Sequence, residues 1–305
     1  MRKRIKNTCI YVVVRLLMAF LRRLSLARSQ RFGAWIGRRV YRWARVERER
    51  MLQNLAQAFP EWTEQERGQV AQSVFMHFAS AVAEVVNVRR IRSLTDFMEM
   101  DPASRQILDD LLARGKGVVF VTAHVGNWEL MARALARYGF PINTIGKRSY
   151  DPRFTRLMQR FRDEGAVRTI WRGDAKTGIK MLSVLRRGEI MGLLIDQDTK
   201  VPGTFVPFFG RLAFTPTAAA LVARKTHAPM VAAFNHRRPD GGYRIVVQQV
   251  LASEIEDENQ AIEADTKELT ARIEAHIRQY PAEWVWMHRR WRTRPEDQEA
   301  DPGSG

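Results

Sequence analysis

The residues best suited to chemistry are a histidine and a glutamate five positions apart, His124 and Glu129. The apolar run over 117–121 is typical of a buried strand, and residues 128–138 predict a helix. His124 therefore follows the carboxyl end of a strand, where open α/β sheets bind ligands. Glu129 lies in the first turn of the helix, so its carboxylate is expected to reach back to one imidazole nitrogen. The other nitrogen is then free to take a proton from a hydroxyl. The alternative is a pair that merely caps a helix.

Alternating strand and helix signals after residue 101 predict the scaffold that positions this pair. Expected strands are 117–121, 141–145, 166–170, 190–195, 230–234 and 243–248, and expected helices are 128–138, 152–163, 175–187, 216–226 and 261–280. This alternation predicts an α/β fold with a mainly parallel central sheet flanked by helices on both faces. Two further helices are expected earlier, over 30–59 and 64–88, the second opened by a capping box that starts at Thr63.

Composition limits the class of protein. Of the 305 residues, 45% are apolar, which is enough for a sizeable core. The single Cys9 excludes a disulfide framework and any multi-cysteine metal site, and it suits a reducing compartment. We expect one domain over 29–294, helical over 29–100 and α/β over 101–294, followed by a flexible tail over 295–305.

The net charge of +17 is concentrated at the N-terminus, where residues 1–50 hold 15 Lys/Arg and 2 Asp/Glu. The apolar run 9–21 is 13 residues long and is interrupted by Arg15. At ~1.5 Å per residue it reaches ~20 Å, short of a ~30 Å hydrocarbon core. We expect residues 1–28 to form a basic amphipathic helix that lies on an anionic membrane. Whether it spans or lies flat stays open, and simple packing on the body is the alternative. Nucleic acid is not an expected partner, because the segment is too apolar for a phosphate-binding tail.

Two other groups of residues have alternative readings. Asp196 and Asp198 follow a strand and could hold Mg²⁺, but no third acid lies close in the sequence and the chemistry needs no metal, so no metal or other cofactor is expected. Residues 288–292 combine cations with aromatics and could bind phosphates or nucleic acid. A solvated face is the alternative there.

Several separated blocks resemble the late lipid A acyltransferases, the lauroyl/myristoyl branch of the lysophospholipid acyltransferase superfamily. They are Asn54-Leu55-Ala56-Gln57-Ala58-Phe59-Pro60-Glu61, His124-Val125-Gly126-Asn127-Trp128-Glu129, Gly146-Lys147-Arg148, Asp196-Gln197-Asp198, Phe205-Val206-Pro207-Phe208-Phe209-Gly210 and Trp286-Met287-His288-Arg289-Arg290-Trp291. They occur in the family's order, from about residue 30 to 291.

The resemblance implies His124 as general base with Glu129 as its acidic partner. It implies that Lys147 and Arg148 bind acceptor phosphate, and that Asp196 with the Phe208-Phe209-Gly210 turn lines the far side of the acceptor cleft. Aromatics over 205–214 are expected to form an acyl-chain slot, unless they only pack the core. Backbone N–H groups of Gly126 and Asn127 are expected to bind negative charge.

The implied function is transfer of a fatty acyl chain from acyl carrier protein to a hydroxyl of a lipid A precursor. It would take place at the cytoplasmic face of the inner membrane, with the protein held peripherally or by a single N-terminal anchor. Alternatives are another glycolipid, lysophospholipid or aminolipid acceptor, acyl-CoA as donor, and a non-catalytic membrane-binding protein.

Overall fold

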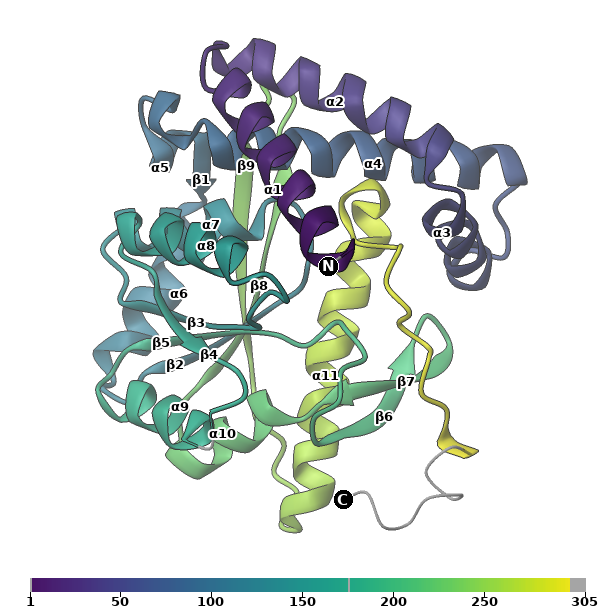
Figure 1. Ribbon diagram of the computed structural model, residues 1–305. Coiled ribbons are helices and arrows are strands. Elements are labelled where there is room, and N and C mark those ends of the chain that lie inside the picture. Colours follow the sequence, from purple (N-terminus) through teal and green to yellow (C-terminus); the bar gives the residue numbers. More distant parts are fainter. Residues whose placement is uncertain (1, 175, 297–305) are drawn as a thin grey trace.

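A seven-stranded sheet forms the centre of the computed structural model, which describes residues 2–174 and 176–296 (Figure 1). The strands are β1 (Met98–Met100), β2 (Val118–Thr122), β3 (Ile142–Gly146), β4 (Arg168–Trp171), β5 (Ile190–Leu194), β8 (Met230–Arg237) and β9 (Tyr243–Val250). Their order is β1-β9-β8-β2-β5-β3-β4, and all neighbours are parallel except β8 and β9. The predicted mainly parallel sheet is confirmed.

Helices cover both faces of this sheet. The helices of the described residues are α1 (Arg2–Leu21), α2 (Leu26–Trp43), α3 (Arg45–Ala58), α4 (Glu64–Val86), α5 (Leu94–Phe97), α6 (Pro102–Ala113), α7 (Trp128–Arg137), α8 (Pro152–Glu164), α9 (Thr177–Arg186), α10 (Ala218–Thr226) and α11 (Glu258–Gln279). Because side chains alternate along a strand, β2 presents Val119 and Val121 to α9, α10 and α11, and Val118 and Phe120 to α6 and α7. The near-continuous apolar strands follow from this double burial.

The structure differs from the sequence expectations in a few elements. The single helix expected over 30–59 is two helices, α2 and α3, which meet at Ala44 with non-helical φ −79° and ψ 65°. The short strand β1, the helix α6 and the hairpin of β6 (Gly203–Phe208) with β7 (Arg211–Pro216) were not expected. The expected boundary between residues 28 and 29 falls inside α2, and the expected tail lies outside the described residues from 297 onward.

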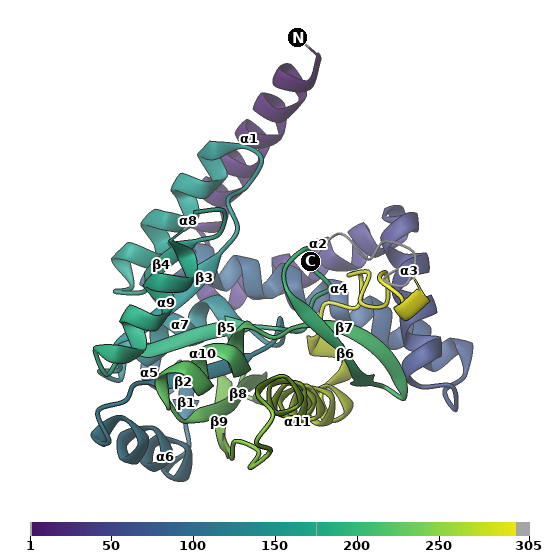
Figure 2. The ribbon, with the colours of Figure 1, turned by 90° about the horizontal axis from the view of Figure 1, so that it is seen from below.

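The N-terminal helices are attached to the body in different ways. Figure 2 shows α1 extending away from the body beside α8, where the Tyr11 and Phe154 rings meet edge to face at 5.6 Å. The helix α2 instead lies directly on α4, as Figure 1 shows. Among the described residues, no helix has both the length and the hydropathy needed to cross a bilayer.

Two glycines allow the close contact of α2 with α4. A Cβ at Gly33 would lie 2.6 Å from the Ala79 carbonyl oxygen, and one at Gly37 would lie 2.3 Å from that of Phe75. Both obstacles are backbone atoms, so a side chain would force the two helices apart. The glycine spacing therefore sets how α2 packs.

We predict that Gly37→Ala destabilises the protein by about 1–3 kcal/mol, because overpacking displaces backbone. Gly68→Ala is the matched control, since its nearest atom is the Tyr41 hydroxyl at 3.9 Å. It should gain about 0.5–1 kcal/mol from helix propensity. Urea unfolding measures both free energies. Equal stability of the two variants would contradict the packing described here.

Candidate active site

His124 and Asp196 meet because their strands are neighbours in register. In the parallel pair β2–β5, Thr122 lies opposite Leu194, so the residues two positions further along each strand leave the sheet side by side. His124 Nδ1 lies 2.8 Å from one Asp196 oxygen, and the His124 backbone N–H donates to the other at 2.9 Å. The strand register thus places a carboxylate on the imidazole.

Asp196 is held ionised in a buried position, at 1% exposure. Burial alone would raise its pKa, but the charge of His124, the two His124 hydrogen bonds and one from the Trp284 indole lower the pKa to about 2. An ionised carboxylate only accepts hydrogen bonds, so Nδ1 carries the proton. In the neutral ring this leaves Nε2 of His124 without a proton, on a side chain that is 24% exposed.

The carboxylate partner of His124 is therefore Asp196. The sequence spacing had suggested Glu129, and that prediction is wrong. Glu129 points toward α8, where both of its oxygens accept hydrogen bonds from the Arg162 guanidinium, at 3.0 and 2.5 Å. The planar fork of arginine matches a carboxylate in this way. Helix α7 directs Glu129 toward this fork, while β5 supplies the acid that reaches the imidazole.

The other expected site residues lie in two different environments. Lys147 and Arg148 are exposed on the loop after β3, at the same sheet edge as His124. Phe208 and Phe209 are buried at 0% and 4% exposure. Phe208 ends β6, and Phe209 with Gly210 forms the two-residue turn of the β6–β7 hairpin. The two phenylalanine rings pack on Trp284, Trp286 and Trp291, so these side chains belong to the core.

The two acids considered for Mg²⁺ are bound separately. Asp196 is used by His124 and Trp284, whereas Asp198 accepts from the Arg292 guanidinium at 2.7 Å and the Thr293 N–H at 2.8 Å. Residues 284–293 thus donate hydrogen bonds to both acids that follow β5. This segment includes residues 288–292, for which the sequence left open a solvated face or a phosphate- or nucleic-acid-binding patch. Buried Arg290 adds hydrogen bonds to the β7 backbone and side chain.

The segment 123–127 between β2 and α7, which we call the histidine loop, carries His124. A cavity of about 840 Å³ opens next to it. Its walls are mainly apolar and come from α1, the end of α4, the start of α7 and α8, and Trp128 and Glu129 are among the lining residues. The Trp128 ring lies 5.0 Å from the His124 ring, centroid to centroid. This cavity is thus walled mainly by helices, and none of the 205–214 aromatics is among its lining residues.

Gly126 is in contact with Asn235, Glu283 and His77. Its φ of +57° and its contact with Asn235, whose Oδ1 would lie 2.3 Å from an added Cβ, require glycine here. Its N–H donates to the Glu283 carbonyl at 3.0 Å. Burial lowers the pKa of His77 to about 3, so neutral His77 donates through Nε2 to the Gly126 carbonyl, 3.0 Å away.

Asn127 links the histidine loop to α4. Its backbone N–H donates to Asn235 Oδ1 at 2.8 Å, and its side chain caps α7 by accepting from the Leu130 N–H. Its amide nitrogen donates to Glu84 at 3.0 Å. The N–H groups of Gly126 and Asn127, which were expected to bind negative charge, are therefore both used within the protein.

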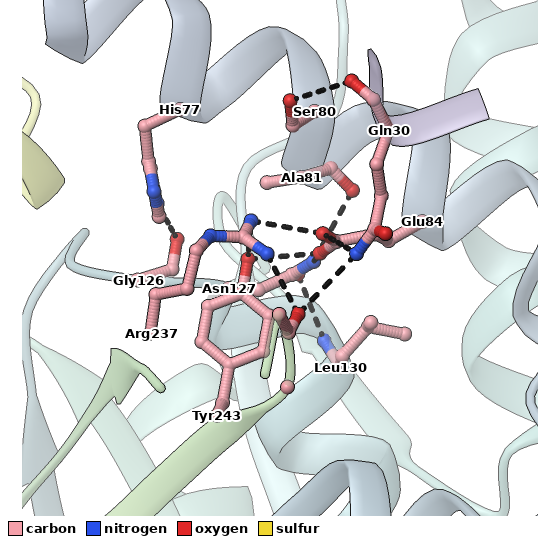
Figure 3. A network of polar contacts seen from close by, with 12 residues as sticks. Gln30, His77, Ser80, Ala81, Glu84, Gly126, Asn127, Leu130, Arg237 and Tyr243 are labelled. Atoms are coloured by element: carbon pink, nitrogen blue, oxygen red, sulfur yellow. Dashed lines mark hydrogen bonds and ion pairs between the residues drawn. The ribbon is translucent and has the colours of Figure 1, made fainter. Parts of the chain in front are cut away.

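Glu84 is the centre of this buried network (Figure 3). Besides Asn127, its carboxylate accepts from Gln30 at 2.9 Å and Tyr243 at 2.8 Å, and it pairs with Arg237 at 2.8 Å. Glu84 is fully buried, so these four partners replace the water that the charge loses. The network connects α2, α4, β8 and β9 to the loop that carries His124.

Glu84, Asn235 and Trp284 were not identified from the sequence. Glu84 sits in an amphipathic helix where a glutamate is ordinary, and no local pattern shows that it faces the core. Asn235 within an apolar strand is the one visible signal, since an amide in a buried strand needs partners.

Removing the Glu84 carboxylate should cost about 3–5 kcal/mol, because the mostly buried Arg237 would lose its partner. We predict this loss for Glu84→Ala by chemical unfolding. Asp109→Ala, which breaks the exposed Arg105–Asp109 pair, is the control and should change stability by less than about 1 kcal/mol. A similar small loss for both variants would refute the role of Glu84.

Glu283 should make stability pH-dependent. Burial raises its pKa from 4.5 to about 7. An acid with a raised folded-state pKa stabilises fully below its unfolded pKa and loses that contribution as pH rises through the folded value. Stability should therefore fall between pH 4.5 and 7, and Glu283→Gln should flatten this part of the unfolding profile. Exposed Glu254→Gln should leave it unchanged, and an unaltered slope in Glu283→Gln would contradict the assignment.

Known proteins similar to this chain agree with the blocks noted in the sequence. The family model described as bacterial lipid A biosynthesis acyltransferase matches residues 2–293. The chain is 28% identical over 278 residues to the lipid A biosynthesis lauroyltransferase of Escherichia coli K12, covering 87% of this chain and 86% of the relative. It is 26% identical over 251 residues to the lipid A biosynthesis palmitoleoyltransferase of that organism, covering 79% and 78%.

A phosphatidylinositol mannoside acyltransferase of Mycolicibacterium smegmatis is 25% identical over 183 residues, covering 59% of this chain and 58% of the relative. The family match spans nearly the whole chain and includes every element around His124. The resemblance found in the sequence is thereby confirmed, and this chain belongs to the bacterial lipid A biosynthesis acyltransferase family and is an acyltransferase.

Proposed function

We propose that this acyltransferase moves a fatty acyl chain from the thioester of acyl carrier protein to a hydroxyl of a lipid A precursor. The observation that carries the proposal is His124, whose Nδ1 is held by ionised Asp196 while Nε2 stays available. The names of the relatives that cover most of the chain support the lipid A acceptor.

The reaction follows from this tautomer. Nε2 of His124 accepts the proton of the acceptor hydroxyl as its oxygen attacks the thioester carbonyl. The imidazolium that forms is stabilised by Asp196. When the tetrahedral intermediate collapses, the carbon–sulfur bond breaks and the thiol leaves with that proton. The ester forms and His124 returns to its starting state, so no metal or cofactor enters the balance.

The cavity beside Trp128 is proposed to hold a fatty chain. Its volume of about 840 Å³ lies within the usual range for ligand pockets, and its lining is mainly apolar. Glu129, which the sequence suggested as the acidic partner of His124, is assigned a positioning role. Its pair with Arg162 fixes α8 against α7 and so keeps the part of the cavity wall that Glu129 lines in shape.

Cations near the site suit a phosphorylated acceptor. Lys147 and Arg148 are exposed at the same sheet edge as His124, and Arg15, Arg22 and Arg89 line the cavity. Guanidinium groups bind phosphate through paired hydrogen bonds. We keep Lys147 and Arg148 as the proposed phosphate-binding pair.

Membrane association through α1 completes the proposal. Its exposed surface carries Val13 and Leu16 at 63% and 65% exposure, which favours contact with lipid. An N-terminal helix that lies on the cytoplasmic face of the inner membrane would bring the cavity to its lipid substrate. The protein would then be peripheral, with α1 as its attachment.

A second candidate acceptor is a mannosylated phosphatidylinositol, favoured by the similarity to mycobacterial enzymes with that name. Purified protein should be assayed with acyl carrier protein and coenzyme A thioesters against both acceptors and a lysophospholipid. Transfer to the lipid A precursor from the carrier protein is the expected result. Preference for another acceptor or donor would overturn that part of the proposal.

We predict that Asp196→Asn lowers kcat by about 10²-fold or more, because an amide no longer enforces the Nδ1–H tautomer. His124→Ala should be nearly inactive. Glu129→Gln, which keeps one hydrogen bond to Arg162, should mainly raise KM. Steady-state kinetics with circular dichroism as a folding control separate these effects. A larger kcat loss in Glu129→Gln than in Asp196→Asn would show that Glu129 is the acidic partner.

A further inference from the structure

The side of α2 that faces away from α4 has an unusual composition. Helix periodicity places eight residues within one wide stripe opposite Gly33 and Gly37. They are Arg28, Arg31, Phe32, Trp35, Arg38, Arg39, Arg42 and Trp43, which we call the outer face of α2. It holds five arginines and no acid. A surface that carries only positive charge either binds an anionic partner or is exposed to solvent.

The exposed tryptophans of this face argue against a surface that only contacts water. Trp35 is 52% exposed and Trp43 is 78% exposed, the latter among the most exposed large apolar side chains described. The Arg39 guanidinium lies 5.1 Å from the centre of the Trp35 ring. Tryptophan and arginine both combine an apolar body with a polar tip, which suits the boundary between lipid headgroups and chains.

The outer face continues into the exposed surface of α1. The rings of Phe20 and Phe32 meet at 5.1 Å, and those of Phe32 and Trp35 stack at 5.6 Å. Phe20 is the last of the exposed apolar residues of α1, after Val13 and Leu16. The two helices thus share one continuous strip, aliphatic on α1 and cationic-aromatic on α2.

We infer that the outer face of α2 binds an anionic lipid bilayer, as a second contact beside α1. This inference rests on the membrane association proposed above and extends it beyond the N-terminal helix. Aliphatic side chains on α1 enter the chain region, while α2 lies at the headgroups. An acidic protein would satisfy the arginines, but it would leave the aliphatic part of the strip without a reason.

This contact would also orient the enzyme. The cavity beside His124 is walled by Leu17, Met18 and Arg22, on and just after α1, so two contacts hold its opening against the bilayer. One helix alone leaves rotation about its own axis free. The second contact removes that freedom.

Membrane binding of the chain of residues 1–305 is measured by co-sedimentation with two kinds of vesicle. Anionic vesicles contain phosphatidylethanolamine and phosphatidylglycerol, and neutral vesicles contain phosphatidylcholine. We expect Trp35→Ala combined with Trp43→Ala, and separately Arg31→Gln combined with Arg38→Gln, to weaken binding to anionic vesicles at least tenfold. The arginine variant should also lose much of the salt dependence. Arg114→Gln with Lys116→Gln, exposed near the end of α6, is the matched charge control and should bind normally.

Unchanged binding of both α2 variants to anionic vesicles would overturn the inference, as would equal binding of the unaltered protein to phosphatidylcholine. Acyl transfer to detergent-dispersed acceptor is measured in parallel. The α2 variants should keep this activity within about twofold, because the outer face lies outside the site. Absence of transfer in unaltered protein that still binds vesicles would refute the proposed function alone.

Discussion

The parallel register of β2 and β5 is the constraint on which the site depends. Because Thr122 lies opposite Leu194, the residues two positions further along, His124 and Asp196, bring an imidazole and a carboxylate within hydrogen-bond distance. Full burial of Asp196 would be costly for a lone charge. Hydrogen bonds from His124 and Trp284 offset that cost, so the ionised acid persists and selects one tautomer of the base.

The histidine loop owes its rigidity to elements far apart in the chain. Helix α4 supplies His77 and Glu84, β8 supplies Asn235, and the segment after α11 supplies Glu283. The helical N-terminal part is therefore an integral support of the site, although the sequence predicted only that residues 29–100 are helical. A fully satisfied buried polar network of this kind specifies one conformation.

Local sequence patterns predicted most of the elements but not their partners. The apolar runs predicted β2 and β5 within one or two residues, and the Thr63 capping box is present. The acid of the pair was misassigned because spacing within one segment favours Glu129, whereas strand order decides that Asp196 lies next to His124. The resemblance implied that Phe208 and Phe209 line the acceptor cleft, whereas both side chains are buried against tryptophans that no local pattern places beside them.

The most direct test of the central claim is the position of the proton on His124. Nitrogen-15 NMR of histidine-labelled protein, with the His124 signals assigned by their loss in His124→Gln, reports both ring nitrogens. We expect a protonated Nδ1 and an unprotonated Nε2 in the neutral ring, with this preference lost in Asp196→Asn. A proton on Nε2, or a tautomer unaffected by that substitution, would contradict the account.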